Sequence, residues 1–136
     1  MTTYVLDSST ALRYFDDGPG ADRFEEILSA CAGQKADLTI SAVQWGEIAG
    51  KLRKRFGASD ERRILSHLLP SEARIVAATA DRAVHAAQLK VDHNLAYADA
   101  FALDLAMDSS DHVLITADYG FKEAADLAQI EFLPAK

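Results

Sequence analysis

The chain has 136 residues, a length that predicts one domain over residues 1–136. With 49% hydrophobic and 26% charged residues, its composition is that of a globular protein with a buried core. A net charge of −7 argues against a protein that coats DNA, because nonspecific nucleic-acid affinity comes from basic surface. The charge still allows a nuclease whose acids share one pocket, and it suits a basic protein partner.

Strand-like and helix-like segments alternate along the chain. Hydrophobic periodicity separates the two types, and capping residues, Gly and Pro mark where helices begin and end. In chain order, we predict a strand over 3–6, helices over 9–15 and 21–32, a strand over 38–40, helices over 42–56 and 59–69, a strand over 73–77, helices over 80–91 and 95–107, a strand over 112–116, a helix over 119–127 and a strand over 130–133. This order predicts an α/β fold, a three-layer sandwich with a mostly parallel sheet of about five strands flanked by helices.

The single cysteine, Cys31, excludes an internal disulfide and indicates a reducing compartment. No basic-then-apolar leader opens the chain. No apolar run approaches the ~20 residues of a membrane helix. We therefore expect a cytoplasmic protein without membrane association.

Two acids, Asp7 and Asp118, each follow a predicted strand. Parallel α/β sheets bind ligands at the carboxyl ends of their strands, where the strand order reverses, and the strands over 3–6 and 112–116 are the natural neighbours at that point. The two carboxylates are therefore expected side by side, and the Thr116 hydroxyl could bond a carboxylate or a metal-bound water. Each acid could instead be a helix cap, although Ser8 can cap the helix over 9–15 in place of Asp7.

Glu47 and Asp99 lie within predicted helices. Because a helix turns ~100° per residue, Glu47 falls roughly opposite the apolar stripe of its helix, and the pattern alone favours a solvated glutamate. Asp99 lies in a helix that is apolar nearly all round. Since a buried carboxylate needs a partner, this favours a functional role over a merely favourable position near a helix N-terminus. Asp104, turned ~140° from Asp99, is predicted to lie on the surface.

Several carboxylates gathered in one place repel one another. Two unit charges ~4 Å apart cost about 4 kcal/mol at an effective dielectric of about 20. A divalent cation removes this cost and suits a set of oxygen ligands. If Asp7, Glu47, Asp99 and Asp118 meet, they predict a metal-dependent phosphodiester chemistry.

A basic run ends the helix over 42–56, with Lys51, Arg53, Lys54 and Arg55 in close succession. Its simplest explanation is a solvated helix end stabilised by the macrodipole. The run could also hold a phosphate backbone near Glu47 or face a partner. The four histidines show no zinc-ligand spacing, and no Gly-rich phosphate loop or Gly-x-Ser-x-Gly elbow is present.

Four short segments occur in order along the whole chain. They are Tyr4-Val5-Leu6-Asp7-Ser8-Ser9, Ser41-Ala42-Val43-Gln44-Trp45-Gly46-Glu47, Leu95-Ala96-Tyr97-Ala98-Asp99-Ala100 and Leu114-Ile115-Thr116-Ala117-Asp118-Tyr119-Gly120-Phe121. Together they resemble the PIN-domain ribonucleases, and most closely the VapC toxins of bacterial toxin–antitoxin modules.

The resemblance implies a PIN-like sandwich and an Mg²⁺- or Mn²⁺-dependent endoribonuclease, the toxin of a type II toxin–antitoxin module. The acidic quartet of the family matches Asp7, Glu47, Asp99 and Asp118 in this chain, and the family's hydroxyl residue just before the last acid matches Thr116. Where many members carry another acid after the last one, this chain has Tyr119-Gly120, which leaves the number of metal ions open. The resemblance also implies a homodimer, an RNA substrate, a small antitoxin across the active groove, and DNA binding only through that antitoxin.

Two other functions remain open. One is a catalytically inactive PIN-like interaction module, against which the presence of all four acids argues. The other is an aspartate-based phosphoryl-transfer domain. A phosphatase of this type needs a second Asp two residues after the first, where this chain has Ser9, and a receiver domain needs an acidic pair before the first strand, which residues 1–3 do not supply.

Overall fold

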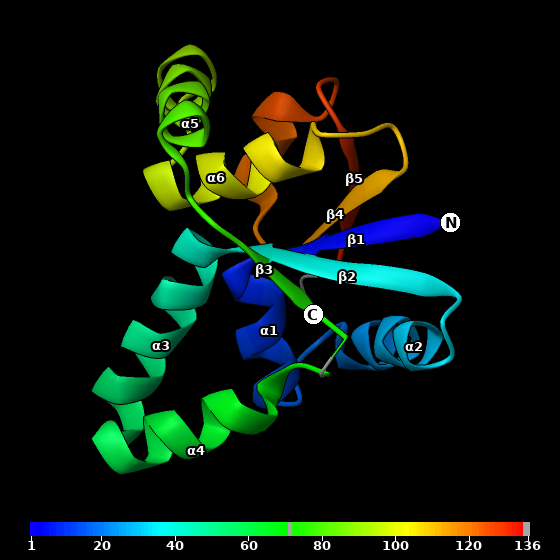
Figure 1. Ribbon diagram of the computed structural model, residues 1–136, viewed down its shortest axis with the longest axis vertical. Coiled ribbons are helices and arrows are strands. Elements are labelled where there is room, and N and C mark those ends of the chain that lie inside the picture. Colours follow the sequence, from blue (N-terminus) through cyan, green and yellow to red (C-terminus); the bar gives the residue numbers. More distant parts are fainter. Residues whose placement is uncertain (71, 135–136) are drawn as a thin grey trace.

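A parallel five-stranded sheet forms the middle layer of the molecule (Figure 1). The computed structural model describes residues 1–70 and 72–134. In spatial order, the strands are β3 (Arg74–Val76), β2 (Ala36–Ser41), β1 (Thr2–Leu6), β4 (His112–Thr116) and β5 (Gln129–Phe132). The order reverses between β1 and β4, so the predicted pairing of these two strands is confirmed.

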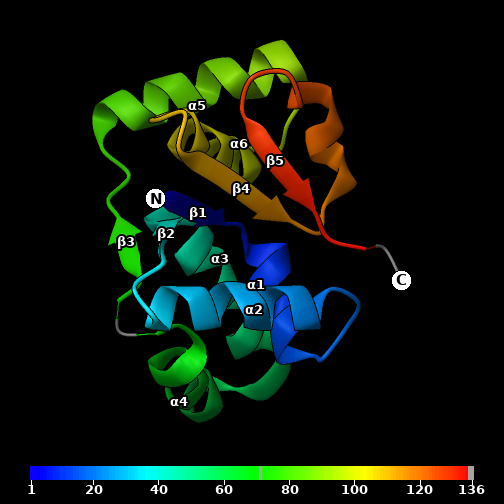
Figure 2. The same ribbon diagram turned by 90° about the vertical axis from the view of Figure 1, so that its right-hand side faces the viewer.

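Helices cover both faces of this sheet (Figures 1 and 2). One face carries α1 (Ser8–Phe15), α2 (Ala21–Ala32), α3 (Ala42–Phe56) and α4 (Ala58–Leu68), and the other carries α5 (Ala80–His93), α6 (Tyr97–Ala106) and the 3₁₀ helix η1 (Tyr119–Ala124). The predicted three-layer α/β sandwich is therefore confirmed. Among the residues described, no helix is long and apolar enough to cross a membrane.

The sheet separates two hydrophobic clusters. Successive strand residues point to opposite faces. Accordingly, Val5 packs in the cluster with α5, α6 and η1, whereas Leu6 packs in the cluster with α1 to α4. Both side chains are fully buried. Burial on both faces explains why the strands are nearly continuous apolar runs.

Most element boundaries lie within two residues of the prediction, and two differences are larger in kind. The break predicted between the helices over 80–91 and 95–107 lies later in the chain, because α5 continues to His93, Asn94 ends it with a positive φ of 55°, and α6 begins only at Tyr97. The predicted helix over 119–127 is a 3₁₀ helix over Tyr119–Ala124. Its buried residues, Phe121 and Ala124, are three apart, which matches the period of a 3₁₀ helix, whose side chains align every third residue.

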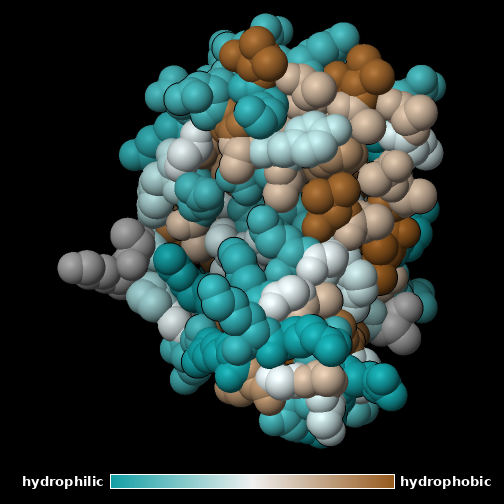
Figure 3. Space-filling model, turned by 90° about the vertical axis from the view of Figure 1, so that its left-hand side faces the viewer, coloured by the Kyte–Doolittle hydropathy of each residue, from teal (hydrophilic) through white to brown (hydrophobic). Residues whose placement is uncertain are grey.

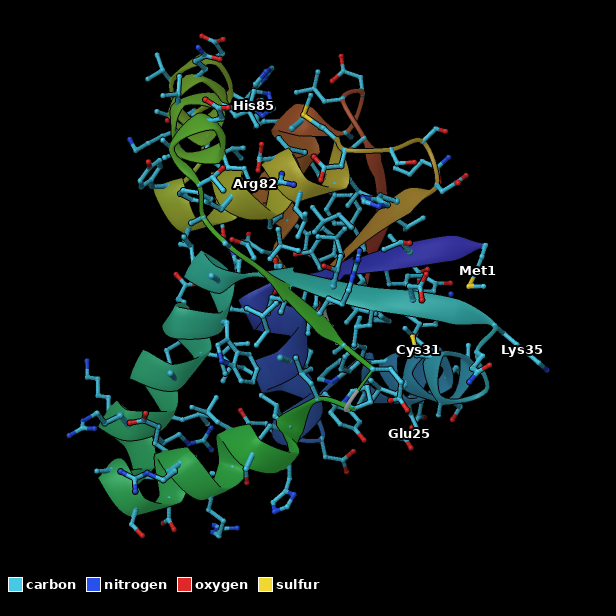
Figure 4. The ribbon with its side chains drawn as sticks, in the orientation of Figure 1. Met1, Glu25, Cys31, Lys35, Arg82 and His85 are labelled. Atoms are coloured by element: carbon cyan, nitrogen blue, oxygen red, sulfur yellow. The ribbon has the colours of Figure 1, made fainter. Side chains whose placement is uncertain are left out.

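Asp104 is not on the surface as predicted, but is 5% exposed. Its carboxylate binds Arg82 at 2.9 Å and His85 at 2.7 Å, and Arg82 also binds Asp108 at 2.6 Å. Figure 4 shows Arg82 and His85 on α5, beside α6. The prediction failed because α5 covers the side of α6 that a single-helix projection assigns to solvent.

Candidate active site

The four predicted acids come from β1, α3, α6 and the segment after β4. Asp7 directly follows β1, and Asp118 lies two residues beyond β4, so both stand where the strand order reverses. This edge of a parallel sheet is where α/β proteins bind ligands. Figure 3 views the side of the molecule toward which the strands run, and hydrophilic residues fill the centre and lower part of this face.

Asp7 is 1% exposed and is fully engaged in hydrogen bonds. Its Oδ1 accepts from the backbone N–H and hydroxyl of Ser9 and from the N–H of Thr10, so Asp7 is the N-cap of α1. The expectation that Ser8 is this cap is wrong, because the Ser8 hydroxyl points to α3 instead. Burial raises the pKa of Asp7 above its ordinary value, although its hydrogen bonds act in the opposite direction.

The Thr116 hydroxyl joins the two strand ends. It donates to Oδ2 of Asp7 at 2.5 Å and accepts from the N–H of Asp118 at 2.9 Å. Thr116 is fully buried, so these two bonds satisfy its hydroxyl away from water. The Asp118 carboxylate is half-buried and accepts from the N–H of Gly120 at 2.8 Å, which makes it the N-cap of η1.

Glu47 lies on the side of α3 that faces α1, and its carboxylate is not simply solvated. Its Oε1 accepts from the Ser8 hydroxyl at 2.5 Å, and the residue is half-buried. Because Ser8 directly follows Asp7, this bond brings Glu47 to the end of β1.

Two polar residues at this site were missed by sequence reasoning. Gln44 is fully buried; its Oε1 accepts from the Ser8 N–H at 2.7 Å and its Nε2 donates to the Ala98 carbonyl at 2.6 Å, so it connects α1, α3 and α6. Ser9 accepts from the Ala117 N–H at 3.1 Å and thereby joins α1 to the end of β4. Gln44 lies one helical turn before the buried Ile48, and that spacing was the available clue.

Asp99 shows that the four carboxylates converge. It lies in the first turn of α6 and is half-buried. Burial raises its pKa to about 7, and the next causes are the negative charges of Asp7, Asp118 and Glu47, while the Gln44 amide acts in the opposite direction. Because repulsion between charges weakens with distance, a carboxyl group whose pKa is raised by three other carboxylates must lie near all of them. The structure therefore brings the four acids close together.

The quartet does not form a closed ligand cage. Over residues 1–70 and 72–134, no group of three or more Asp, Glu, His or Cys side chains has the arrangement of a metal site. Asp7, Glu47 and Asp118 are instead bonded to their own serine, threonine or backbone donors. The result is an open cluster of carboxylate oxygens, chemically suited to a hard divalent cation.

Comparison with solved structures gives the same fold at low sequence identity. The VapBC2 complex of Rickettsia felis bound to promoter DNA matches with a TM-score of 0.77 and 17% identity, over 98% of this chain and 100% of the other. VapC20 of Mycobacterium tuberculosis, described as a sarcin–ricin-loop-cleaving toxin, matches with a TM-score of 0.69 and 17% identity over 96% and 99%. A toxin–antitoxin complex of Klebsiella pneumoniae matches with a TM-score of 0.63 and 21% identity over 94% and 95%.

The sequence itself carries the family assignment. A search of curated proteins finds no match. The family model of the PIN domain, however, matches residues 4–127, a span that includes all four acids and Thr116. This chain belongs to the PIN domain family.

Proposed function

We propose that this protein is an Mg²⁺- or Mn²⁺-dependent endoribonuclease and the toxin of a type II toxin–antitoxin module. The observation that carries the proposal is the hydrogen-bond network that holds the elements of Asp7, Glu47, Asp99 and Asp118 together at the carboxyl edge of a PIN-domain sheet, through Thr116, Ser8 and Gln44. The similarity to VapBC and VapC structures supports the toxin assignment. A metal-free role offers no reason to keep four mutually repelling carboxylates together.

The donor set fits the proposed ion. Mg²⁺ and Mn²⁺ prefer oxygen ligands, and the four residues offer carboxylate oxygens. Asp7 and Asp99 would be the main direct ligands, and Glu47 and Asp118 would complete the site through waters or orient the nucleophile. When bound, the metal would lower the pKa of a coordinated water and neutralise charge on the phosphate oxygens.

The other site residues position these acids. The Thr116 hydroxyl fixes Oδ2 of Asp7, and the Ser8 hydroxyl holds Glu47 against the start of α1. Gln44 fixes α6 relative to α1 through its bond to the Ala98 carbonyl, next to Asp99. Fixed ligand orientation matters because loss of such supporting bonds typically costs 10- to 100-fold in metal affinity or activity.

The proposed partners follow from the same assignment. The protein would bind RNA as substrate and a cognate antitoxin as inhibitor, form a homodimer, and contact DNA only through the antitoxin, in the cytoplasm. The net charge of −7 is compatible with this indirect DNA contact and with a basic antitoxin. Complexes of toxin with antitoxin are among the structures of similar fold.

The function is tested with purified, antitoxin-free protein and structured RNAs, in Mg²⁺ or Mn²⁺ with and without chelator. Asp7→Asn and Asp99→Asn are compared with Asp92→Asn, which changes an exposed acid on α5. We expect metal-dependent cleavage by the unmodified protein and by Asp92→Asn, and at least about a tenfold loss in the other two. Metal-independent cleavage, or full activity of either site variant, would refute the mechanism. Absence of cleavage on every RNA would favour the inactive interaction module.

A further inference from the structure

Positive charge is concentrated beside the acidic site, in an otherwise acidic protein. Residues 51–63, the second half of α3 and the first half of α4, hold six of the fourteen Lys and Arg residues but only two of the twenty-one acids. Three of these cations are occupied, since Arg53 pairs with Glu61 at 3.3 Å, Arg55 with Asp16 at 2.7 Å and Arg63 with Asp60 at 3.4 Å. Lys51 and Lys54 are exposed and form no ion pair with any residue that the structure describes.

These two lysines continue the side of α3 that starts at the acidic site. Lys51 and Lys54 follow Glu47 by four and seven residues, which places all three within an arc of about 60° around the helix. We call this stripe the α3 flank. Lys54 lies about 10 Å beyond Glu47 along the helix axis. The neighbouring Gly46 and Gly50 leave the surface open, because a Cβ at either position would meet nothing within 4 Å.

The macrodipole does not account for the whole flank. Its effect is confined to the last turn of a helix, and α3 ends at Phe56. Lys51 lies more than a full turn before that end, outside the reach of this effect. The lower part of Figure 3, over α3 and α4, shows hydrophilic residues across this region of the same face.

An aromatic pair ends α3, but it lies on the side opposite the flank, because Phe56 follows Glu47 by nine residues and is turned ~180° from it around the helix. The rings of Phe15 and Phe56 meet edge to face with centroids 5.6 Å apart, and each residue is 37% exposed. The Arg55 guanidinium lies 4.8 Å from the centre of the Phe56 ring. The Phe56 ring therefore contacts Phe15 and Arg55, and the α3 flank itself offers phosphate contacts alone.

We propose that single-stranded RNA runs from the acidic site along the α3 flank, with its phosphates held by Lys51 and Lys54. The inference rests on the proposed ribonuclease function. An acidic peptide could use the same two lysines, but nothing would draw it toward four carboxylates. Cleavage, by contrast, requires a strand that delivers one phosphate to the acids, and the flank begins there.

The test compares RNA binding by Lys51→Gln/Lys54→Gln with that of Lys35→Gln/Lys90→Gln, a control that removes the same charge away from α3. Lys35 lies at the opposite end of the sheet, as Figure 4 shows. The probe is a short fluorescein-labelled single-stranded RNA of mixed sequence, and anisotropy is recorded in chelator over a range of salt concentrations. Because each phosphate contact in a single strand contributes a slope of ~0.7 to the dependence of log affinity on log salt, we expect the slope to fall by ~1.4 in the flank variant and to stay unchanged in the control.

Two further measurements test the proposed path. Phe56→Leu changes the opposite side of α3 and should leave both the RNA affinity and its salt slope unchanged. In metal-dependent cleavage, the flank variant should raise KM with little change in kcat, as expected for lost uniform binding. An unchanged salt slope in the flank variant overturns the inference, as does weakened binding of an acidic protein partner with unaltered RNA binding. If the unmodified protein binds RNA through the flank but cleaves none, the proposed ribonuclease function fails while the inference stands.

Discussion

Thr116, the last residue of β4, donates its hydroxyl hydrogen to Oδ2 of Asp7, the first residue after β1, over 2.5 Å. This bond joins the two strands at the point where the sheet order reverses. It also fixes one oxygen of a fully buried carboxylate, while Ser9 and Thr10 fix the other. The proposed central metal ligand is therefore held in place by the fold itself.

Replacing Thr116 by Val should destabilise the protein by about 1–3 kcal/mol, because a buried oxygen of Asp7 and the N–H of Asp118 both lose their partner. The proposed cleavage activity should fall at least about tenfold, since Asp7 is then free to turn. Thr116→Ser keeps the hydroxyl and serves as the control. Urea unfolding and RNA cleavage are the measurements, and a Val variant equal to the Ser variant in both would contradict this role.

In chelator, stability should depend on pH through Asp99. Its pKa rises from 3.8 to about 7 on folding, so the folded state binds this proton more tightly than the unfolded state does. The resulting stability is fully present below about pH 4 and is lost as the pH rises through about 7. Denaturant unfolding of the metal-free protein should therefore show a falling free energy of unfolding over this range.

Asp99→Asn should flatten this pH dependence, and Asp92→Asn, at an exposed position, should not. A residual slope of the same sign is expected from Asp7, whose pKa is also raised by burial. An Asp99→Asn protein with the same pH profile as the unmodified protein would show that the four acids do not interact as described.

The ion pairs of Arg82 with Asp104 and Asp108 should contribute to stability without contributing to catalysis. Arg82→Ala leaves the buried Asp104 without one of its two partners, and we expect a loss of about 1.5–3 kcal/mol, as for a hydrogen bond to a charged group. The matched control is Arg63→Ala, whose ion pair with Asp60 is exposed, and which should lose less than about 1 kcal/mol. Thermal or urea unfolding measures both, and equal losses would contradict the structural role given to Arg82.

Gln44→Met tests the connection between α1, α3 and α6. The substitution keeps the length of the side chain but removes both hydrogen bonds, the one that Gln44 accepts from the Ser8 N–H and the one that it donates to the Ala98 carbonyl. We expect a loss of about 1–3 kcal/mol and a lower cleavage rate, because Glu47 and Asp99 lie on the helices that Gln44 joins. A variant with reduced stability but unaltered cleavage at a permissive temperature would show that Gln44 supports the fold alone.

The sheet could be predicted because strands are marked by short segments of sequence and because strand order in parallel sheets follows general topological rules. Apolar runs with turn residues between them located all five strands, and the reversal of strand order located Asp7 and Asp118 beside each other. Asp99 was found because a carboxylate in a helix that is apolar on all sides is unusual. The functional roles of these residues stay predictions, since geometry alone does not test them.

What the sequence did not reveal depends on contacts between helices. Gln44 belongs to the buried face of α3, which the apolar stripe alone did not indicate. The same stripe predicted that Glu47 is solvated, whereas its carboxylate accepts a hydrogen bond from the Ser8 hydroxyl. Asp104 was assigned to the surface because no single-helix projection shows that α5 covers it with Arg82 and His85. Polar partners across elements follow from the packed fold, and hydrophobic periodicity does not encode them.

Mn²⁺ binding to the purified protein tests the central claim most directly. Isothermal titration of the unmodified protein, Asp99→Asn and Asp92→Asn compares one member of the quartet with an exposed acid of equal charge. If the four acids form one metal site, Asp99→Asn should weaken Mn²⁺ affinity at least about tenfold, and Asp92→Asn should leave it unchanged. Equal Mn²⁺ affinity in all three proteins, or no binding by the unmodified protein, would contradict the account.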